Sequence, residues 1–197
     1  MKEWKSWIEE KILESKMKVF RKNLIDFDSW GMQDDGNFGR PDKKFWGLFG
    51  FRVETPDGSW EQPLVEEYGE GAVVLIKARG EESFLLQAKA EPGNDPDKGY
   101  LMLNATLSAS KSNLKGLGIK TVSRVTLFEN ELDLKAMPQD GGKYSRKINF
   151  YGVLEKDKES IKLNENERWF TREEIREAMQ EGLIAEHLAQ ALFTYLI

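Results

Sequence analysis

Three consecutive segments decide the fold of this chain: Ala72-Val-Val-Leu-Ile-Lys-Ala78, Arg79-Gly-Glu81 and Ser83-Phe-Leu-Leu-Gln-Ala-Lys-Ala90. Two short apolar runs joined by a glycine-bearing connection are typical of a β-hairpin, and both runs are apolar enough to be central in a sheet. The following Pro92-Gly-Asn-Asp-Pro96 ends the ladder, because proline has no N–H to donate. The sequence therefore predicts an antiparallel strand pair at the centre of a sheet.

More strands are expected on both sides of this hairpin. Residues 44–54 are aromatic and β-branched, and Thr55-Pro-Asp-Gly-Ser59 has the composition of a tight turn. Residues 100–110 alternate apolar and polar side chains, and residues 144–153 form a further apolar run. The pattern of residues 114–135 is ambiguous.

Helices are expected at both ends of the chain. Residues 2–22 place apolar side chains at helical spacing with Lys and Glu between them. These apolar side chains are Trp4, Trp7, Ile8 and Ile12. Near the other end, Thr171 and Glu174 have capping-box spacing, Gly182 is a plausible helix stop, and a last helix is expected from about residue 184 to 195. The fold class is thus α+β: a mixed or antiparallel sheet flanked by helices, with residues 1–22 as an N-terminal amphipathic helix and 23–197 as one domain.

Composition excludes several classes of function. The 197 residues are 40% apolar, which suits one globular domain, and they include no Cys and a single His. Disulfides, thiolate metal sites and a cysteine nucleophile are therefore excluded. With 29 basic and 34 acidic residues the net charge is −5, which argues against general nucleic-acid binding. No apolar run approaches the ~18 residues of a membrane helix, so we expect a cytoplasmic protein with no membrane partner.

Polar side chains on the central strands are the first candidates for chemistry. Gln87, Lys89 and Glu91 project from one face of the strand that ends at the Gly-Asn loop. An amide, a cation and a carboxylate in register are unusual for a pure core. The alternative is a solvated sheet face that carries an ordinary ion pair.

Neighbouring segments supply hydroxyls, amides and cations that suit a sugar or a phosphate. The candidates are Thr106, Ser108, Ser112 and Asn113 on one segment and Arg146, Lys147 and Asn149 on another. Each set is also compatible with an exposed strand face. The lone His187, near the edge of the last helix's apolar stripe, is expected to be packed or solvent-facing rather than catalytic.

The segment Gln87-Ala-Lys-Ala-Glu-Pro-Gly-Asn94 resembles the Q-A-K-x-E-P-G-N signature of the NDP-hexose 2,3-dehydratase family. In that family a segment close to L-S-P-T-V-Q-A-T-x-S-N-Y follows. Here it reads Leu103-Asn-Ala-Thr-Leu-Ser-Ala-Ser-Lys-Ser-Asn-Leu114, which keeps Thr106, Ala109, Ser112 and Asn113. The Ser-Pro, the Gln and the final Tyr are missing.

Weaker similarities extend this resemblance to roughly residues 24–196. Gly58-Ser-Trp-Glu-Gln-Pro63 matches a W-x-Q-P motif, and Arg146-Lys-Ile-Asn149 resembles an R-K-x-N strand. Lys44-Phe45 with Gly50 partly matches a G-K-F-F stretch, and Trp169-Phe170 a W-[FL] pair.

The resemblance implies a Nudix-like fold without the Nudix magnesium box. Residues 172–182 echo that acidic helix only faintly, with the wrong spacing, and are interpreted as a solvated amphipathic helix. Family members usually carry two similar modules and act on dTDP-4-keto-6-deoxyhexoses. This chain corresponds to one module, so the resemblance implies a homodimer in which two copies replace the pair.

The resemblance also implies a reaction and its residues. Water leaves from C2 and C3 of the 4-keto sugar, which needs a base, a proton donor and donors around the enolate oxygen, but no metal or cofactor. Glu91 is expected to be the base or to position it, and Lys89 to be the proton donor or the partner of the enolate. Gln87, Asn94, Thr106, Ser108, Ser112, Asn113 and Asn149 would bind the sugar, and Arg146 and Lys147 the diphosphate.

Two other functions remain open: a binding module that holds a nucleotide or nucleotide sugar without turnover, and another proton-transfer enzyme, such as an isomerase. One structural expectation follows from the single module. The Trp-rich stripe of residues 2–22 is expected to pack across a dimer interface rather than on the chain's own sheet, because large aromatic residues are enriched at interfaces.

Overall fold

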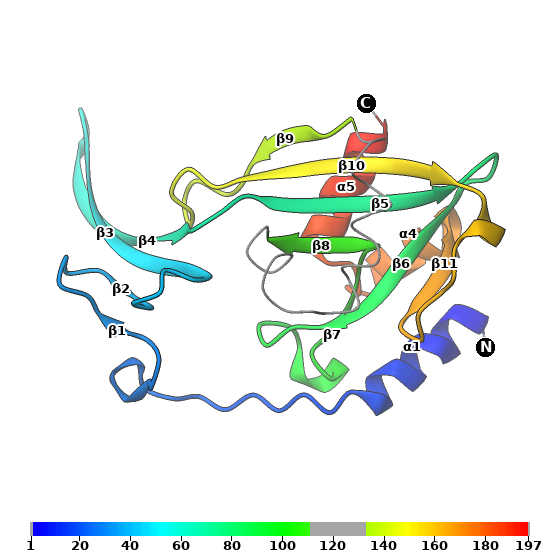
Figure 1. Ribbon diagram of the computed structural model, residues 1–197, viewed down its shortest axis with the longest axis horizontal. Helices are drawn as coiled ribbons and strands as arrows, with labels where there is room; N and C mark the ends of the chain where they lie inside the picture. Colours follow the sequence, from blue (N-terminus) through cyan, green and yellow to red (C-terminus); the bar gives the residue numbers. More distant parts are fainter. Residues whose placement is uncertain (1, 111–132, 197) are drawn as a thin grey trace.

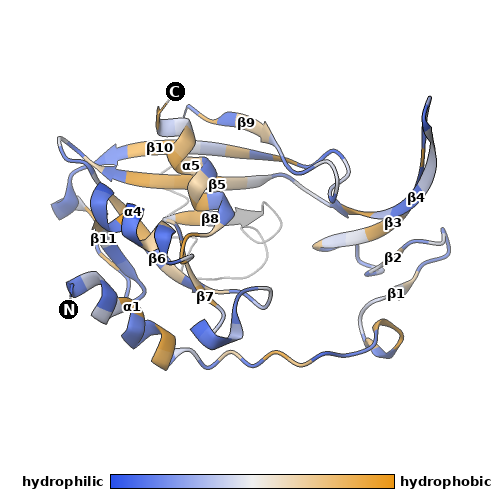
Figure 2. Ribbon diagram, turned by 180° about the vertical axis from the view of Figure 1, so that it is seen from behind, coloured by the Kyte–Doolittle hydropathy of each residue, from blue (hydrophilic) through white to orange (hydrophobic). Residues whose placement is uncertain are grey.

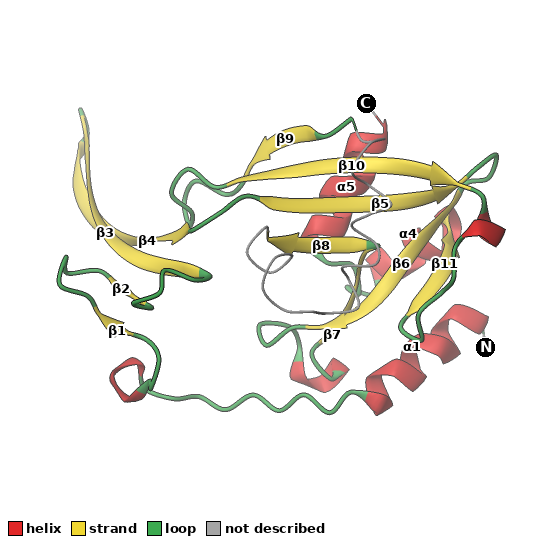
Figure 3. Cartoon of the chain, viewed as in Figure 1, coloured by secondary structure: helices red, strands yellow, loops and turns green. Residues whose placement is uncertain are grey.

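A computed structural model describes residues 2–110 and 133–196, with only the backbone at residues 109 and 110. The fold is α+β, with one four-stranded and one seven-stranded sheet and helices packed on the larger one (Figures 1 and 3). The predicted fold class is confirmed. The expectation of a single sheet is wrong, because the strands between residues 31 and 67 pair among themselves rather than with the central hairpin.

The larger sheet has the order β11-β6-β5-β10-β9, with β7 added to β6 and β8 added to β5. Its strands are β5 (Gly71–Ala78), β6 (Ser83–Ala90), β7 (Leu101–Ala105), β8 (Leu107–Ser110), β9 (Lys135–Pro138), β10 (Ile148–Lys156) and β11 (Glu167–Thr171). Strands β5 and β10 run parallel in a register that begins at Gly71 and Asn149. The other pairs are antiparallel. Because β5 and β10 are parallel and in register, both strands begin at the same edge of the sheet.

The predicted hairpin is present, but its two strands soon separate. Strands β5 and β6 pair only near their connection, at Ile76–Leu85 and Lys77–Phe84, and β8 then takes the place of β6 beside β5. At this fork, the Thr106 hydroxyl accepts a hydrogen bond from the Ile76 N–H at 3.0 Å and donates one to the Leu85 carbonyl. The expected continuous strand over residues 100–110 is therefore divided at Thr106 into β7 and β8.

Apolar side chains fill both sides of β5. Val73 and Leu75 belong to a large buried cluster that also includes residues of α4 (Arg172–Gln180) and α5 (Glu186–Leu196). Val74 and Ile76 belong to a smaller cluster on the opposite side. Figure 2 shows apolar residues along β5, β10 and α5. Strand β5 is therefore central, as its near-continuous apolar run predicts.

The N-terminal helix α1 spans Glu3–Glu14, not the whole of residues 2–22. Trp4 is fully buried in the large cluster, and the Trp7 ring meets Phe170 edge-to-face at 5.8 Å. The prediction that this stripe covers a dimer interface is wrong, because its side chains pack on the chain's own core. The helix ends where that support ends, since Leu13 and Phe20 are 85% and 82% exposed.

The smaller sheet forms an arm, which we define as residues 31–67. It contains β1 (Gly31–Met32), β2 (Phe38–Gly39), β3 (Trp46–Thr55) and β4 (Gly58–Glu67) in that order. The strand and the tight turn predicted over residues 44–59 are confirmed, because β3 and β4 pair in a ladder that runs from Trp46–Glu67 to Thr55–Gly58. The β3–β4 hairpin projects away from the larger sheet (Figure 1), while Trp30 packs on Trp46 at 4.3 Å at its foot.

The C-terminal part follows the sequence closely. Thr171 and Glu174 form the predicted capping box at the start of α4, and Gly182, at φ 66°, follows the end of that helix. Helix α5 begins two residues later than expected, at Glu186. Short 3-10 turns occur at η1 (Leu24–Asp26), η2 (Pro96–Lys98) and η3 (Lys158–Ser160). Within the described ranges, no helix is both long and apolar enough to span a membrane.

Candidate active site

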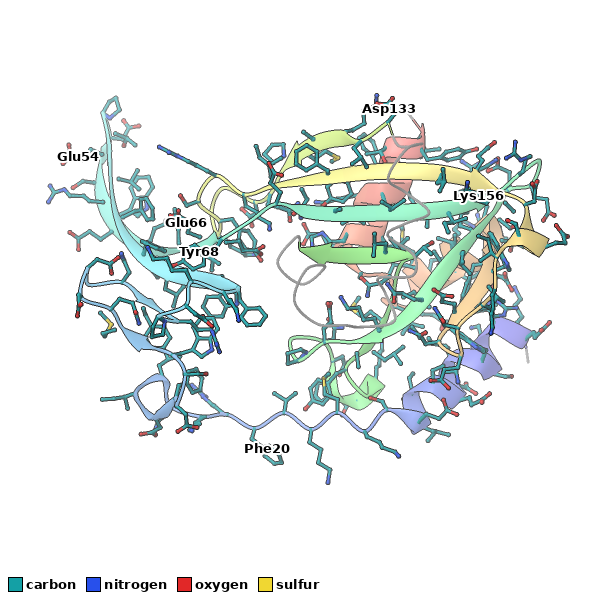
Figure 4. The ribbon with its side chains drawn as sticks, viewed as in Figure 1. Phe20, Glu54, Glu66, Tyr68, Asp133 and Lys156 are labelled. Carbon is teal, nitrogen blue, oxygen red and sulfur yellow. The ribbon has the colours of Figure 1, made fainter. Side chains whose placement is uncertain are left out.

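A polar cavity of about 220 Å³ lies where the arm joins the larger sheet. Its walls come from the foot of the arm, the first residues of β5 and β10, the end of β6, strand β8 and the start of α5. The residues that line it are Phe45, Trp46, Glu67, Gly71, Ala72, Val73, Lys89, Glu91, Ser108, Gln139, Tyr144, Lys147, Asn149 and His187. Figure 4 shows Glu66 and Tyr68 at this junction and Glu54 far out on the arm.

One wall is built by the paired starts of β5 and β10. Asn149 is 4% exposed and lies opposite Gly71 in the register. A Cβ atom on residue 71 would lie 2.3 Å from the Asn149 Oδ1 atom, so only glycine leaves room for this amide. Among the described residues, no donor contacts that Oδ1 atom. A buried acceptor without a partner is costly, so this wall is suited to a ligand hydroxyl that donates to it.

Lys89 and Glu91 form an ion pair at the cavity, with the Nζ and Oε1 atoms 2.7 Å apart. They lie two residues apart, so both side chains leave the same face of the chain. Their side chains are 34% and 43% exposed, and Lys89 also lies 3.5 Å from the Ser108 carbonyl oxygen of β8. The pair is therefore partly accessible to a ligand.

A second ion pair joins the larger sheet to the arm. The Lys147 ammonium contacts the Glu67 carboxylate, and the two side chains are 6% and 25% exposed. The cavity lining thus has two cations, each with a carboxylate beside it, and these charges balance. A lining of this kind suits an uncharged polar group such as a sugar ring better than a diphosphate.

Hydrogen bonds behind the cavity connect β10 with α5. Tyr151 is fully buried, and its hydroxyl oxygen lies 3.1 Å from the His187 Nδ1 atom. The same hydroxyl donates to the Gln190 Oε1 atom and accepts from the Gln139 Nε2 atom at 2.9 Å. Burial raises the pKa of Tyr151, so the phenol stays protonated at neutral pH. His187, expected to be packed or solvent-facing, is half-buried and lines the cavity.

The rim carries two aromatic side chains from the foot of the arm. Phe45 and Trp46 are 43% and 36% exposed, and the Arg40 guanidinium lies 5.6 Å from the Phe45 ring centre. Phe45 has a φ of 72°, a left-handed conformation that costs about 1–2 kcal/mol for a residue with a Cβ. Such strain is concentrated at functional sites.

The cavity brings together five of the residues singled out from the sequence. These are Lys89, Glu91, Ser108, Lys147 and Asn149. Ser112 and Asn113 lie outside the described residues. Sequence reasoning missed Phe45, Trp46, Glu67, Gly71, Gln139 and Tyr144, and it did not place His187 here. Only the G-K-F-F resemblance pointed toward Phe45, because the other residues are united by long-range pairing.

Four of the predicted site residues do not line the cavity. The Gln87 Nε2 atom donates to the Ala105 carbonyl at 2.8 Å, and the Asn94 Nδ2 atom donates to the Tyr100 carbonyl at 2.9 Å. Thr106 is 3% exposed at the fork, and Arg146 is exposed outside the cavity lining at φ 52°. The two amides of the signature thus hold the backbone around the cavity, while its two charged residues reach the cavity itself.

Comparison with known proteins adds independent information. A model of the NDP-hexose 2,3-dehydratase family matches residues 1–196. A dTDP-4-dehydro-6-deoxy-α-D-glucopyranose 2,3-dehydratase of Amycolatopsis orientalis is 26% identical over 194 residues, which cover 90% of this chain and 40% of that protein. The enzyme of the same name from Streptomyces violaceoruber is 25% identical over 173 residues, covering 83% of this chain and 38% of the relative.

A third relative of that name, from Saccharopolyspora spinosa, is 32% identical over 120 residues, covering 56% of this chain and 24% of its own length. The chain therefore spans at most 40% of the length of these relatives. The similarity extends well beyond the signature, because the family match includes nearly the whole sequence.

Proposed function

The chain belongs to the NDP-hexose 2,3-dehydratase family, and we propose that its cavity removes water from the sugar of an NDP-4-keto-6-deoxyhexose. One observation carries this proposal. Lys89 and Glu91, the two charged side chains of the family signature, line one cavity together with the buried Asn149 amide. The relatives' names support dTDP-4-keto-6-deoxyglucose as the substrate.

The size of the cavity supports binding of the sugar alone. Its volume of about 220 Å³ is below the ~300–1,000 Å³ typical of sites that enclose a whole drug-sized ligand. The hexose would occupy the cavity, with Ser108 and Asn149 bonded to its hydroxyls. The diphosphate and the base would lie at the rim, where the exposed Arg146 is adjacent in sequence to the cavity residue Lys147.

The reaction chemistry assigns roles to the ion pair. The C4 ketone acidifies the hydrogen on C3, and loss of that proton gives an enolate from which the C2 hydroxyl can depart. We propose that Lys89 stabilises the enolate oxygen or protonates the leaving hydroxide. The Glu91 carboxylate, 2.7 Å away, would serve as the base or position Lys89.

The remaining signature residues would act less directly. Gln87 and Asn94 bond to backbone carbonyls around the cavity, so we propose that they shape the site rather than touch the sugar. Thr106, bonded to two backbone groups at the fork, would do the same. Ser112 and Asn113 remain proposed sugar ligands on the strength of the family resemblance alone.

The test is incubation with dTDP-4-keto-6-deoxyglucose and detection by mass spectrometry of a product that has lost one water. Lys89→Ala and Glu91→Gln should each lower the rate at least ~100-fold if they take part in proton transfer. Arg52 and Glu54 provide a matched control, because this exposed pair on the arm has the same two-residue spacing, at 2.9 Å. Arg52→Ala and Glu54→Gln should keep the wild-type rate. An Lys89 or Glu91 variant that is folded and nearly fully active would remove that residue from the mechanism.

A binding module is the second candidate. The loss of the Ser-Pro, Gln and Tyr of the second motif favours it. A shift in melting temperature with dTDP but no turnover of the keto sugar would support binding alone. Formation of an isomer without loss of water would instead support an isomerase on the same scaffold.

We also propose a homodimer and a Nudix-like arrangement of the larger sheet. The dimer would place a second copy where the family resemblance implies a second module. Sedimentation as a monomer at micromolar concentration would count against it. The mixed sheet with the parallel β5–β10 pair and α5 packed on one face supports the fold, and superposition of an experimental structure on a Nudix hydrolase would test it. A nucleotide-sugar substrate is also consistent with a cytoplasmic location.

A further inference from the structure

His187, the single histidine of the sequence, is held at one nitrogen and lines the cavity. It comes from the start of α5, whereas Lys89 comes from β6, so two different elements bring these groups to the same cavity. Imidazole is the side chain most often used for proton transfer. Which of its nitrogens carries a proton decides what it can do.

The hydrogen bonds around Tyr151 determine the tautomer. The Gln190 Nε2 atom donates to the Glu186 carboxylate at 3.1 Å, which orients the amide so that its Oε1 atom faces Tyr151. The Gln139 Nε2 atom lies 3.3 Å from that Oε1 atom, a contact that suits the same orientation. An amide oxygen can only accept, so the single hydroxyl proton of Tyr151 is used in the bond to Gln190.

The Tyr151 oxygen must therefore accept from its other neighbours. Gln139 donates to it at 2.9 Å, the Asn149 side chain also interacts with it, and the His187 Nδ1 atom, 3.1 Å away, forms a bond there only when it carries a hydrogen. In neutral imidazole the second nitrogen then has a free lone pair. This nitrogen, Nε2, has no hydrogen-bond partner among residues 2–110 and 133–196.

We propose that His187 is the base that removes the proton from C3 of the bound sugar, through its Nε2 atom. This rests on the proposed function and gives the second proton-transfer role to a residue outside the signature. The Glu91 carboxylate is ion-paired with the Lys89 ammonium, and we assign it the role of positioning Lys89. Tyr151 is a positioning residue, because it fixes the imidazole without lining the cavity.

The steps balance as follows. Nε2 takes the C3 proton, and the electron pair of that bond forms the enolate, with the negative charge on the oxygen at C4. The enolate then forms the C2–C3 double bond as the C2–O bond breaks, and the departing hydroxide takes a proton from Lys89 and leaves as water. The imidazolium returns its proton to solvent, Lys89 regains one from solvent, and the enol product rearranges to the diketone.

This assignment separates the two halves of the reaction experimentally. In D2O with dTDP-4-keto-6-deoxyglucose, enolate formation exchanges the C3 hydrogen for deuterium, whereas elimination releases water. His187→Asn is the sharpest variant, because an Asn amide can still donate to Tyr151 but has no equivalent of Nε2. In this variant the rates of C3 exchange and of water elimination should both fall at least ~100-fold.

The other variants should behave differently. Lys89→Ala should retain C3 exchange while water loss falls at least ~100-fold. Tyr151→Phe should lower kcat about 10-fold with little change in KM and should alter the pH profile of kcat. Glu54→Gln is the unaffected control. Melting temperature and dTDP binding of each variant establish that it is folded.

The outcomes are distinguishable. If wild type eliminates water and His187→Asn keeps C3 exchange within about 3-fold of wild type, the base lies elsewhere and this proposal is overturned while the proposed function stands. If wild type binds the keto sugar but shows neither exchange nor elimination, the proposed function fails and the role of His187 fails with it. Loss of exchange in His187→Asn but not in Lys89→Ala supports the assignment.

Discussion

At the fork between β6 and β8, the Thr106 hydroxyl bonds to two backbone groups, the Ile76 N–H and the Leu85 carbonyl. Thr106→Val keeps the shape and leaves the Ile76 N–H and the Leu85 carbonyl without this partner in the core. We expect a loss of about 1–3 kcal/mol in the free energy of unfolding, measured by denaturant titration, because buried polar groups are left unsatisfied. Thr106→Ser, which keeps the hydroxyl, is the control. If Thr106→Val leaves stability unchanged but weakens substrate binding, Thr106 would instead be a sugar ligand.

The sequence predicts the surroundings of a single residue where its partners are close in the chain. The two-residue spacing of Lys89 and Glu91 predicted correctly that both side chains share a face. Lys147 is predicted to contact the diphosphate, and its local pattern does not indicate Glu67, 80 positions earlier in the chain, whose carboxylate contacts its ammonium. Local patterning contains no information on a partner that only the join between arm and sheet supplies. The place of His187 beside Tyr151 of β10 likewise has no local signal in the sequence.

At the scale of elements, α1 should contribute to the stability of the chain itself. Trp4 is fully buried in the core cluster, and its Nε1 atom donates to Glu177 at 3.2 Å. Trp4→Ala should therefore cost about 3–5 kcal/mol of unfolding free energy, as for other large buried side chains. Trp60→Ala, on the arm and 49% exposed, is the matched control and should cost less than about 1 kcal/mol.

Chemical denaturation measures the free energy of unfolding of both Trp variants, and sedimentation reports whether their self-association changes. A Trp4→Ala protein of unchanged stability but weaker self-association would return α1 to an interface. The earlier expectation failed because apolar periodicity identifies a face that must be buried but not the surface that buries it.

Strand prediction succeeded where the pattern was local and failed where partners are exchanged. The runs that form β5 and β6 were identified closely, and so was the β3–β4 hairpin with its turn. The replacement of β6 by β8 beside β5 has no local signal, since the alternation of residues 100–110 continues through the bend. The break depends on Thr106 meeting two other strands, which only the folded chain provides.

The whole molecule should lose stability in alkaline solution. Burial raises the pKa of Tyr68, Tyr144 and Tyr151, so the folded chain holds these protons more tightly than the unfolded chain. Their contribution is complete below the unfolded pKa of ~10 and is lost as pH rises above it toward the folded values. Unfolding free energy, measured by denaturant titration at a series of pH values, should fall in this range. The fall should be smaller in Tyr151→Phe, and an equal fall in both proteins would contradict this account.

The cavity is a property of the whole chain rather than of one motif. Its lining extends from Phe45 to His187, so the signature contributes only two of its side chains. Sequence similarity indicated the family, and polar strand faces indicated part of the site. The closing of the cavity by the arm depends on how two sheets meet, and a pattern within either sheet does not contain that information.

The segment between α1 and the arm is an extended linker. Residues 16–23 lie outside regular structure and run in extended form from α1 to η1, which precedes the arm (Figure 1), with Phe20 on this segment (Figure 4). A fully extended chain advances only ~3.3–3.6 Å per residue, so this extended linker cannot stretch much further to replace deleted residues. Insertion of residues would make the linker longer and more flexible, at a small entropic cost. Deletion of residues would shorten the linker. Either α1 would then lose its packing on the core, or the arm, which forms one wall of the cavity, would be displaced.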